Sequence, residues 1–237
     1  MEITPKKMIE IQDLRFEYPN RQAALQGIDL QIAPGEKAAL VGLNGAGKST
    51  LLLHLNGILN GHGTVWIDGI RLSAATTRQI RALVGLVFQS PDDQLFSPTV
   101  FEDVAYGPLY QGLPLAQIEE RVSTALSMVG MQDYRDRTSY HLSLGEKKRV
   151  AIATVLSMQP KILALDEPSA GLDPRARRNL IRLLKELPHT MLIATHDLGL
   201  VEEAASRVLV MSKGKIVADG MTGQILKDQE TLQKFLL

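Results

Sequence analysis

The stretch GLNGAGKST, Gly42 to Thr50, decides the fold of this 237-residue chain. It matches G-x-x-x-x-G-K-[ST] in full and stands between a short apolar strand pattern and a helical pattern. Glycines let backbone N–H groups curl around a phosphate, Lys48 supplies a positive charge to the outer phosphates, and Ser49 can bind Mg²⁺. A tight turn before an ordinary helix is the alternative interpretation. The residues expected to contact the nucleotide here are Gly42, Asn44, Gly45, Ala46, Gly47, Lys48, Ser49 and Thr50.

The segments around this loop predict an α/β fold. Apolar and polar residues alternate in 8–18 and 27–33, which predicts a small N-terminal antiparallel sheet. Later apolar strands alternate with helices, which predicts a parallel sheet covered on both faces. The predicted later strands lie within residues 83–89, 161–168, 190–197 and 207–220, with a helix at 174–187 between the second and third.

Helical patterns punctuated by Gly and Pro fill the middle of the chain, from about Ser90 to Gln159. We therefore expect one domain over 1–237: a nucleotide-binding core at about 1–89 and 160–237, and an inserted helical subdomain at about 90–159.

Two acidic residues follow a predicted strand in ILALDEP, residues 162–168. Such a strand delivers Asp166 to the carboxyl edge of the sheet, where ligands of α/β folds collect and where an aspartate can hold Mg²⁺. Glu167 can polarise a water for attack on the γ-phosphate. Alone, this pair is more typical of a helix-capping loop; downstream of a phosphate loop it indicates a catalytic site.

Composition narrows the class of partner. Lys and Arg number 26, as do Asp and Glu, so the formal net charge is zero and nucleic acid is not an expected partner. There are no cysteines, and the sequence predicts neither a secretion signal nor a membrane span. If the protein works at a membrane, another chain must hold it there.

A second helix start with anion-binding character occurs in HLSLGEKKRVAIA, residues 141–153. Ser143 and Gly145 stand at its beginning. The basic residues that follow, Lys147, Lys148 and Arg149, are interpreted as a solvated helix face that offsets Glu146.

The order of these motifs resembles the nucleotide-binding subunits of ABC transporters along nearly the whole chain: the phosphate loop, Gln89 in VFQS, the signature LSLGE, ILALDEP, SAGLD, and His196 in ATHD. The resemblance implies a P-loop NTPase (RecA-like) core, ATP and Mg²⁺ as cofactors, and ATP hydrolysis. It assigns catalysis to Glu167, His196, Gln89 and Lys48; Mg²⁺ to Ser49, Gln89 and Asp166; and further nucleotide contacts to Tyr18, Ser143, Gly145 and Asp173.

Four of these assignments have structural alternatives. Gln89, implied to respond to Mg²⁺ and the attacking water, would otherwise be a surface residue. Tyr18, implied to stack on adenine, would otherwise pack in the core. His196, implied to contact the γ-phosphate, would otherwise be a satisfied core histidine. Asp173, implied to organise the subunit contact, would otherwise be an N-cap before Pro174, and both roles are compatible.

The resemblance also implies a head-to-tail dimer, homodimeric or heterodimeric, in which Ser143 and Gly145 of one copy meet the γ-phosphate bound at Lys48 of the other. The signature departs from the family's usual L-S-G-G-Q at Leu144 and Glu146. These two departures are expected to alter the contact of the signature with the ribose side of the nucleotide and the rate of ATP hydrolysis.

Residues 88–114 are similar to ATPases of energy-coupling factor (ECF) transporters, particularly those for cobalt and nickel. In that family this region, here Pro91 to Phe101, contacts a transmembrane scaffold subunit, and a separate membrane subunit binds the substrate. Leu95, Phe96, Val100 and Phe101 are the candidate apolar anchors; packing within the helical subdomain is the alternative, favoured for Val100 and Val104.

The sequence therefore predicts an ATPase on the cytoplasmic face of the membrane, peripheral to it, that drives an ECF importer for cobalt or nickel. A biotin or other vitamin ECF importer and a conventional ABC importer are the alternatives. A soluble ABC ATPase acting on DNA or ribosomes is disfavoured by the absence of a long coiled-coil insertion. A non-hydrolysing scaffold is disfavoured because Lys48, Asp166, Glu167 and His196 are all present.

Overall fold

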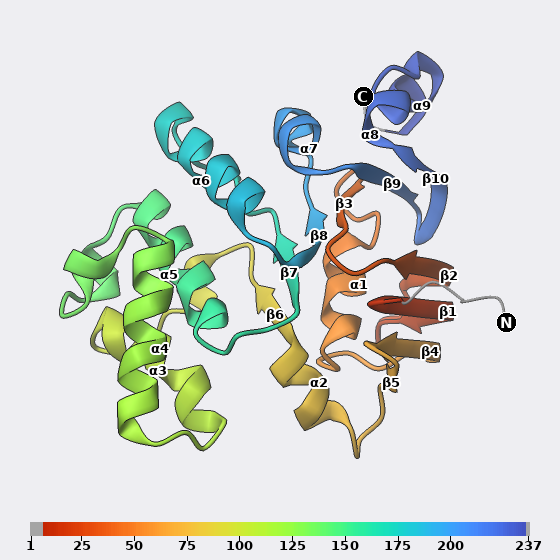
Figure 1. Ribbon diagram of the computed structural model, residues 1–237. Helices are drawn as coiled ribbons and strands as arrows, with labels where there is room; N and C mark the ends of the chain where they lie inside the picture. The colour runs from red at the N-terminus through yellow and green to blue at the C-terminus, as the bar shows by residue number, and fades with distance from the viewer. Residues whose placement is uncertain (1–6, 236–237) are drawn as a thin grey trace, which may run out of the picture. The chain divides into compact units, whose positions relative to one another are not determined.

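The computed structural model describes residues 7–235, and these divide into two compact units (Figure 1). The first contains the described chain up to Leu86, residues 161–167, and the described chain from Pro188 onward. The second contains Val87–Pro160 and Pro168–Leu187. The second unit thus includes residues 168–187, which the sequence assigned to the core.

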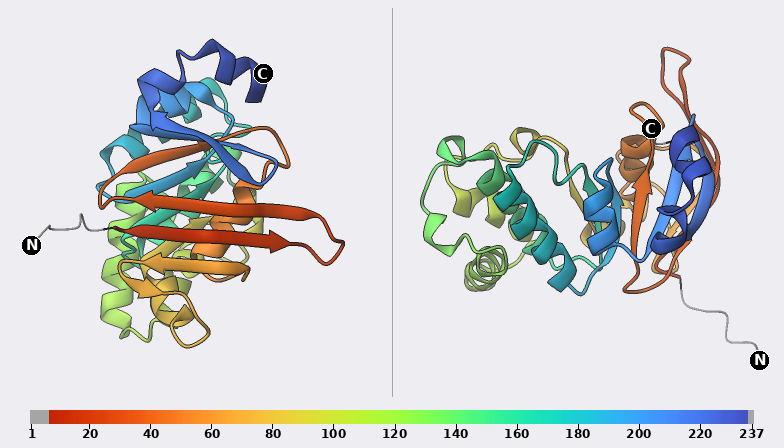
Figure 2. Two further views of the ribbon diagram at one scale, coloured as in Figure 1. Left: turned by 90° about the vertical axis from the view of Figure 1, so that its right-hand side faces the viewer. Right: turned by 90° about the horizontal axis from the view of Figure 1, so that it is seen from above.

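A four-stranded antiparallel sheet forms one layer of the first unit. Its strands lie side by side in the left view of Figure 2. Alternate residues of the first strand, such as Ile9 and Ile11, are buried, because one face of the sheet packs against the core. The predicted antiparallel β subdomain is confirmed. In sheet order the strands are β2 (Ala23–Ile32), β1 (Ile9–Glu17), β4 (His62–Ile67) and β5 (Ile70–Arg71).

The second sheet has six strands and is mixed rather than wholly parallel as expected. β3 is parallel to β8 and β9, and β7 is parallel to β8, but β10 is antiparallel to β9. The reversal occurs because Lys213 and Gly214 both have positive φ, 46° and 76°, as in the tight turns of β-hairpins. In order the strands are β10 (Lys215–Met221), β9 (Arg207–Ser212), β3 (Lys37–Val41), β8 (Thr190–Ala194), β7 (Ile162–Asp166) and β6 (Val84–Val87).

Helix α1, Lys48–Leu55, contacts strands of both sheets: β7 and β8 in one, β2 and β4 in the other. Leu51, Leu52 and Leu55 are buried along it. This packing on two sides holds the start of α1 just beyond the carboxyl end of β3. The other helices of the first unit are α2 (Thr77–Leu83), α7 (Leu198–Ala204), α8 (Thr222–Ile225) and α9 (Gln229–Phe235).

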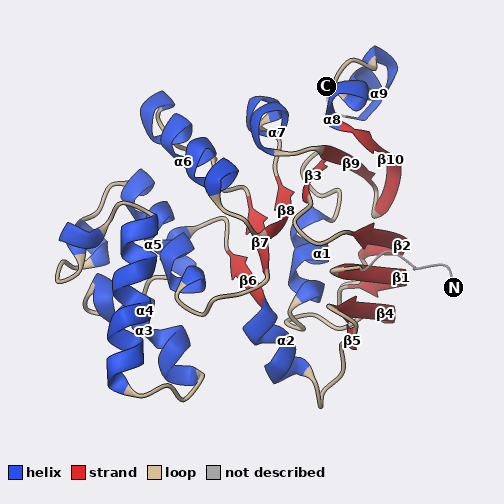
Figure 3. Cartoon of the chain, viewed as in Figure 1, coloured by secondary structure: helices blue, strands red, loops and turns tan. Residues whose placement is uncertain are grey.

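The second unit is built from helices (Figure 3). α3, α4 and α5 contact one another, and α6 contacts α5. Along α4 the buried residues Ile118, Val122, Ala125 and Leu126 follow the helical period, as the sequence predicts. Its helices are α3 (Val100–Tyr110), α4 (Leu115–Met128), α5 (Leu144–Leu156) and α6 (Pro174–Glu186), with the 3₁₀ turns η1 (Pro91–Asp93), η2 (Gln132–Tyr134) and η3 (Ser139–His141).

Within residues 7–235, every helix is too short or too polar to cross a membrane.

Candidate nucleotide site

The glycine-rich loop after β3 needs its glycines for steric reasons. Gly47 has φ 108°, and a Cβ there would lie 2.5 Å from the carbonyl oxygen of Ala24. At Gly42 a Cβ would lie 2.1 Å from the carbonyl oxygen of Met211. Any side chain at either position would force the loop away from these strands. The motif therefore depends on close backbone packing as well as on φ.

The loop delivers an open helix start. Gly47 is the N-cap of α1, and no side-chain hydrogen bond caps this helix in the described part of the chain. The first backbone N–H groups of a helix have no partner within it, and the helix dipole is positive there. The start of α1 is therefore suited to an anion such as phosphate. Ala46 differs from its neighbours in the loop, because it is buried and donates its N–H to the oxygen of Leu43.

Lys48 is buried at the start of α1. Its Nζ donates to the carbonyl oxygens of Gly42, at 2.7 Å, and Leu43, at 3.3 Å. Burial lowers the pKa of Lys48, and the negative charges of Glu167 and Asp166 act in the opposite direction. Charged phosphate oxygens are stronger acceptors than carbonyls, so the ammonium group can exchange its loop partners for a phosphate.

Glu167 is held in a strained conformation directly after β7. Its φ is 44°, and its N–H donates to the carbonyl oxygen of Ala194 at 2.8 Å. Such a conformation costs about 1–3 kcal/mol and persists only where the surroundings enforce it. The side chain is buried, with 8% of its surface exposed. This geometry fixes the direction of the carboxylate.

Residues after β8 contact the Glu167 carboxylate. Nδ1 of His196 lies 2.9 Å from Oε2, and the Thr195 hydroxyl donates to the same oxygen at 3.3 Å. The His196 side chain is 67% exposed, so its interpretation as a core histidine is wrong. Thr195 was not predicted as a site residue; its place beside His196 in ATHD is the signal for it.

Tyr18 follows β1 and is half-buried. Its hydroxyl lies 3.1 Å from Oγ1 of Thr50 in α1, and its ring makes an edge contact with Phe16, with centroids 5.0 Å apart. These contacts tie the ring to the phosphate-loop helix.

The residues expected to hold Mg²⁺ divide between the units. Ser49 is exposed in the first turn of α1, and the Asp166 carboxylate is near enough to act electrostatically on the neighbouring Lys48. Gln89 is exposed after β6 in the second unit. Hydroxyl, carboxylate and amide oxygens are hard donors, and Mg²⁺ uses few protein ligands when phosphate and water supply the rest. The hydroxyl of Ser49 and the carboxylate of Asp166, both in the first unit, are donor types that fit Mg²⁺.

Ser143 caps α5 in the second unit. Its N–H and hydroxyl donate to Oε2 of Glu146, at 2.9 and 2.7 Å, and the Glu146 N–H donates back to the hydroxyl at 3.4 Å. This is a capping box, which the spacing Ser143-x-x-Glu146 signals in the sequence. Gly145 lies against α6, because a Cβ there would lie 2.9 Å from Cβ of Ala176.

Asp173 caps α6, as its structural alternative predicted. Its Oδ1 accepts from the N–H groups of Arg175, at 2.8 Å, and Ala176, at 3.0 Å. Pro174 begins the helix.

Two sequence expectations in this unit are wrong. Lys148 is not on a solvated face, because only 5% of it is exposed and α5 turns it inward. Leu95 is not an exposed anchor, because it is buried, as is Val100. Phe96 is 68% exposed and makes an edge contact with Tyr106 at 5.3 Å.

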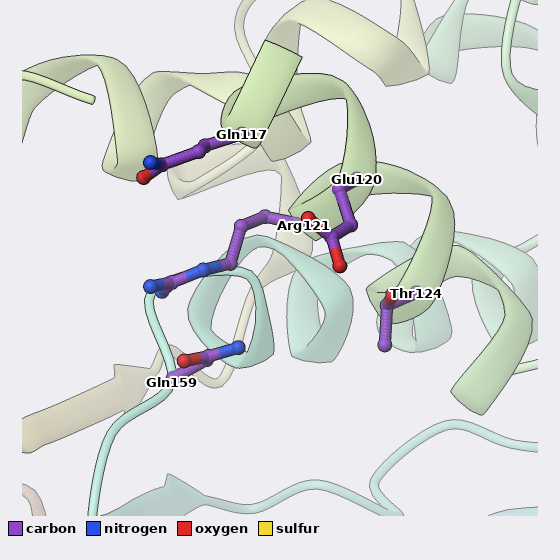
Figure 4. Close-up of a pocket in the computed structure, with 5 residues that line it drawn as sticks. All are labelled: Gln117, Glu120, Arg121, Thr124 and Gln159. Carbon is purple, nitrogen blue, oxygen red and sulfur yellow. The ribbon is translucent and has the colours of Figure 1, made fainter. Parts of the chain in front are cut away.

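A polar pocket of about 270 Å³ lies in the second unit (Figure 4). It is lined by Gln117, Glu120, Arg121, Thr124 and Gln159. Four of these come from α4 and Gln159 from the loop after α5. None of the predicted site residues lines it.

A glycine-rich loop between β3 and α1, with acidic residues at the end of a parallel strand, defines a nucleotide-binding protein of the P-loop class. Residues 25–170 match the ABC transporter family, and the chain belongs to that family. It is an ATP-binding enzyme, an ABC-type ATPase.

Similar proteins support this membership. A putative ABC transporter ATP-binding protein of Gloeobacter violaceus is 54% identical over 226 residues, covering 94% of this chain and 93% of that protein. The energy-coupling factor transporter ATP-binding protein EcfA of Methanothermobacter thermautotrophicus is 49% identical over 233 residues, covering 96% and 75%.

Solved structures show the same fold. That of cbiO1 from Clostridium perfringens, described as part of the ABC transporter complex cbiONQ, has a TM-score of 0.85 and 39% identity, covering 97% of this chain and 94% of that one. A dimeric post-hydrolysis structure of the ATP-binding cassette MJ0796 with ADP and Pi has a TM-score of 0.81 and 26% identity, covering 91% and 99%.

Proposed function

We propose that this chain is the ATP-hydrolysing subunit of an ECF-type ABC importer, in which a head-to-tail dimer couples ATP binding and hydrolysis to uptake of cobalt or nickel ion. The similarity to EcfA and to cbiO1 of the cbiONQ complex supports the ECF class. Biotin or another vitamin is the alternative cargo, and a conventional ABC importer is the alternative class.

The observation that carries the catalytic part of the proposal is the charge arrangement around Lys48. Its ammonium group, at the open start of α1, is within electrostatic reach of Asp166 and Glu167. In the proposed reaction Lys48 binds the outer phosphates, and the rigid Glu167 carboxylate polarises the attacking water. His196, whose Nδ1 lies 2.9 Å from the Glu167 carboxylate, would contact the γ-phosphate.

Mg²⁺ would neutralise phosphate charge when bound with ATP. Ser49, Asp166 and Gln89 are the proposed ligand set, directly or through water. Tyr18 would stack on adenine, its ring oriented by Phe16 and Thr50.

In the proposed dimer, Ser143 and Gly145 of one copy would lie against the phosphates bound by the other, with Asp173 at the subunit contact. The membrane partners are a transmembrane scaffold subunit and a separate substrate-binding subunit, so the ATPase would work at the cytoplasmic face of the membrane. Exposed Phe96, with Tyr106 beside it, is the proposed contact to the scaffold.

Glu167→Gln tests the catalytic part. The amide keeps the shape of the side chain but cannot act as a base, so hydrolysis is expected to fall about 100-fold or more. ATP binding is retained, and an ATP-bound dimer accumulates on gel filtration. Glu202→Gln, an exposed acid in α7, is the matched control. An unchanged hydrolysis rate in Glu167→Gln would remove Glu167 from this role.

The transport assignment is tested by co-purifying the protein with its membrane subunits and measuring ATP-dependent uptake of radiolabelled cobalt, nickel and biotin into vesicles. Uptake of a metal ion is expected. Phe96→Asp should spare ATPase activity of the isolated protein but detach it from the scaffold, whereas Leu115→Asp, at an exposed position of α4, should do neither. Uptake of biotin alone would replace the metal with the alternative cargo.

A further inference from the structure

The segment that carries Gln89 is tied to helix α5, the helix that begins at the signature Ser143. The segment leaves β6 at Val87 and forms the 3₁₀ turn η1, and η1 contacts α5. All these residues belong to the second unit. Two side chains, buried Lys148 and half-buried Gln94, make the connection.

Lys148 reaches the segment from α5. Its Nζ donates to the main-chain oxygen of Gln89 at 3.3 Å, and only 5% of the residue is exposed. Burying an ammonium group costs free energy unless the group is hydrogen-bonded. The hydrogen bond to Gln89 therefore helps to hold the Lys148 side chain in this buried position. The contact uses the main chain of Gln89, and its side chain stays exposed.

Gln94 lies in the segment itself and connects it to α5. Its Oε1 accepts from the N–H of Phe88 at 3.1 Å, and its Nε2 donates to the oxygen of Ala151 at 2.8 Å and to Oγ1 of Thr154 at 2.7 Å. One amide therefore bridges the residue before Gln89 to the middle of α5. Lys148 and Gln94 hold the main chain on both sides of the Gln89 peptide.

The neighbouring contact between Lys147 and Asp92 differs in kind. Nζ and Oδ1 are 2.7 Å apart, but the Asp92 side chain is 69% exposed. An ion pair with an exposed partner contributes little to stability, because water screens the charges. Lys147 is therefore a matched control for Lys148: it is the same residue type, one position away on the same helix, but its side chain is 16% exposed and its Nζ pairs with an exposed carboxylate.

We propose that Lys148 and Gln94 are positioning residues of the ATPase reaction, which hold the Gln89 main chain to α5 so that the Gln89 side chain and the Ser143 helix start are presented as one body. The inference rests on the proposed function, because that function makes Gln89 a ligand of Mg²⁺ in the ATPase reaction. It predicts an effect on turnover that passes through Gln89 and leaves nucleotide binding intact.

The test is a double-mutant cycle on the full chain, with ATP hydrolysis measured against ATP and Mg²⁺ concentration. Lys148→Met keeps the aliphatic length and removes the donor. It is expected to lower kcat about tenfold, as for loss of a charged hydrogen bond, and to raise the Mg²⁺ requirement, while KM for ATP is unchanged. Lys148→Arg should recover most of the rate, and Lys147→Met should match the parent.

The decisive comparison is with Gln89→Ala. If Lys148 acts through Gln89, adding Lys148→Met to Gln89→Ala causes no further loss. Gln94→Met tests the same relation from the other side and serves if Lys148→Met does not fold. Additive losses, or full activity of Lys148→Met, overturn the positioning role alone. Full activity of Gln89→Ala overturns the proposed task of Gln89, and the positioning role falls with it.

Discussion

The two helix starts proposed to bind phosphate are built in opposite ways. α1 begins at Gly47, which has no side chain to offer, with Lys48 as its first residue. α5 begins at Ser143, whose hydroxyl is bound to the Glu146 carboxylate at 2.7 Å. One helix start has a cation and no side-chain cap; the other already holds an anionic group. The same backbone geometry is therefore proposed to serve two tasks: binding phosphate in its own subunit at α1 and contacting the phosphate of another subunit at α5.

The difference lies in what an incoming phosphate must displace. At α1 only the carbonyl contacts of Lys48 are exchanged. At α5 the Ser143 hydroxyl must leave Glu146, and the negative charge of Glu146 remains close by. The hydrogen bond from Ser143 lowers the pKa of Glu146, with a further contribution from Tyr134, so this carboxylate is ionised at neutral pH. We infer that α1 provides tight binding and that α5 provides a weaker contact that depends on the second subunit.

The largest effect is expected at the uncapped helix. Lys48→Ala removes the ammonium group at the start of α1, and ATP affinity should fall about 100-fold or more, which abolishes binding at micromolar ATP. Equilibrium binding of a fluorescent ATP analogue measures this. Lys227→Ala, at an exposed lysine of the same unit, is the control. Retained tight binding by Lys48→Ala would refute the loop assignment.

Ser143→Ala should have the next largest effect. Loss of the cap lowers the free energy of unfolding by about 1 kcal/mol. ATP hydrolysis also falls, because alanine has no hydroxyl to contact the phosphate bound by the other subunit. Urea unfolding and ATPase assays separate the two effects. Thr99→Ala is the control, because Thr99 and Glu102 form the same capping box at α3. Equal loss of activity in both variants would make the Ser143 effect purely structural.

Glu146→Gln should change activity in the other direction. The amide oxygen can still accept from the Ser143 N–H, but the negative charge at the helix start is gone. A charge at a helix end is worth about 0.3–1 kcal/mol, so the ATP-induced dimer should tighten and hydrolysis rise about two- to fivefold. Gel filtration with ATP and steady-state rates check this. Glu102→Gln alters the matching box at α3 and should leave both unchanged. A slower Glu146→Gln enzyme would contradict the charge argument.

The smallest effect is on the pH dependence of stability. Because the folded state lowers the pKa of Glu146, its contribution is present above the unfolded value of about 4.3 and is lost as the pH falls through the lower, folded value. The stability difference between the parent and Glu146→Gln should therefore be constant near neutral pH and shrink below about pH 4. Urea unfolding across this range measures it. A difference that grows on acidification would show that the carboxylate is not stabilising.

Local patterns account for what the sequence predicted correctly. The phosphate loop, the strand ending in Asp166 and the helix beginning at Ser143 each depend on spacing within a short stretch, and their order along the chain identifies the family. Two further features also had local signals: the Ser143-x-x-Glu146 cap and the Lys213–Gly214 turn that makes β10 antiparallel.

Other features depend on residues far apart in the chain. Burial of Lys148 requires the main chain of Gln89 beside α5, and burial of Leu95 requires the packed helical unit. No periodicity distinguishes these positions from a solvated helix face or an exposed anchor.

The sequence by itself determined the chemistry of this protein, because backbone conformation at a phosphate loop and the charge of Lys48, Asp166 and Glu167 are properties of short segments. Only the tertiary structure decided which side chains face solvent and which hold others in place, as with Lys148 and Gln94. The physical reason is that desolvation and hydrogen bonding are set by neighbours that the fold brings together from distant parts of the chain.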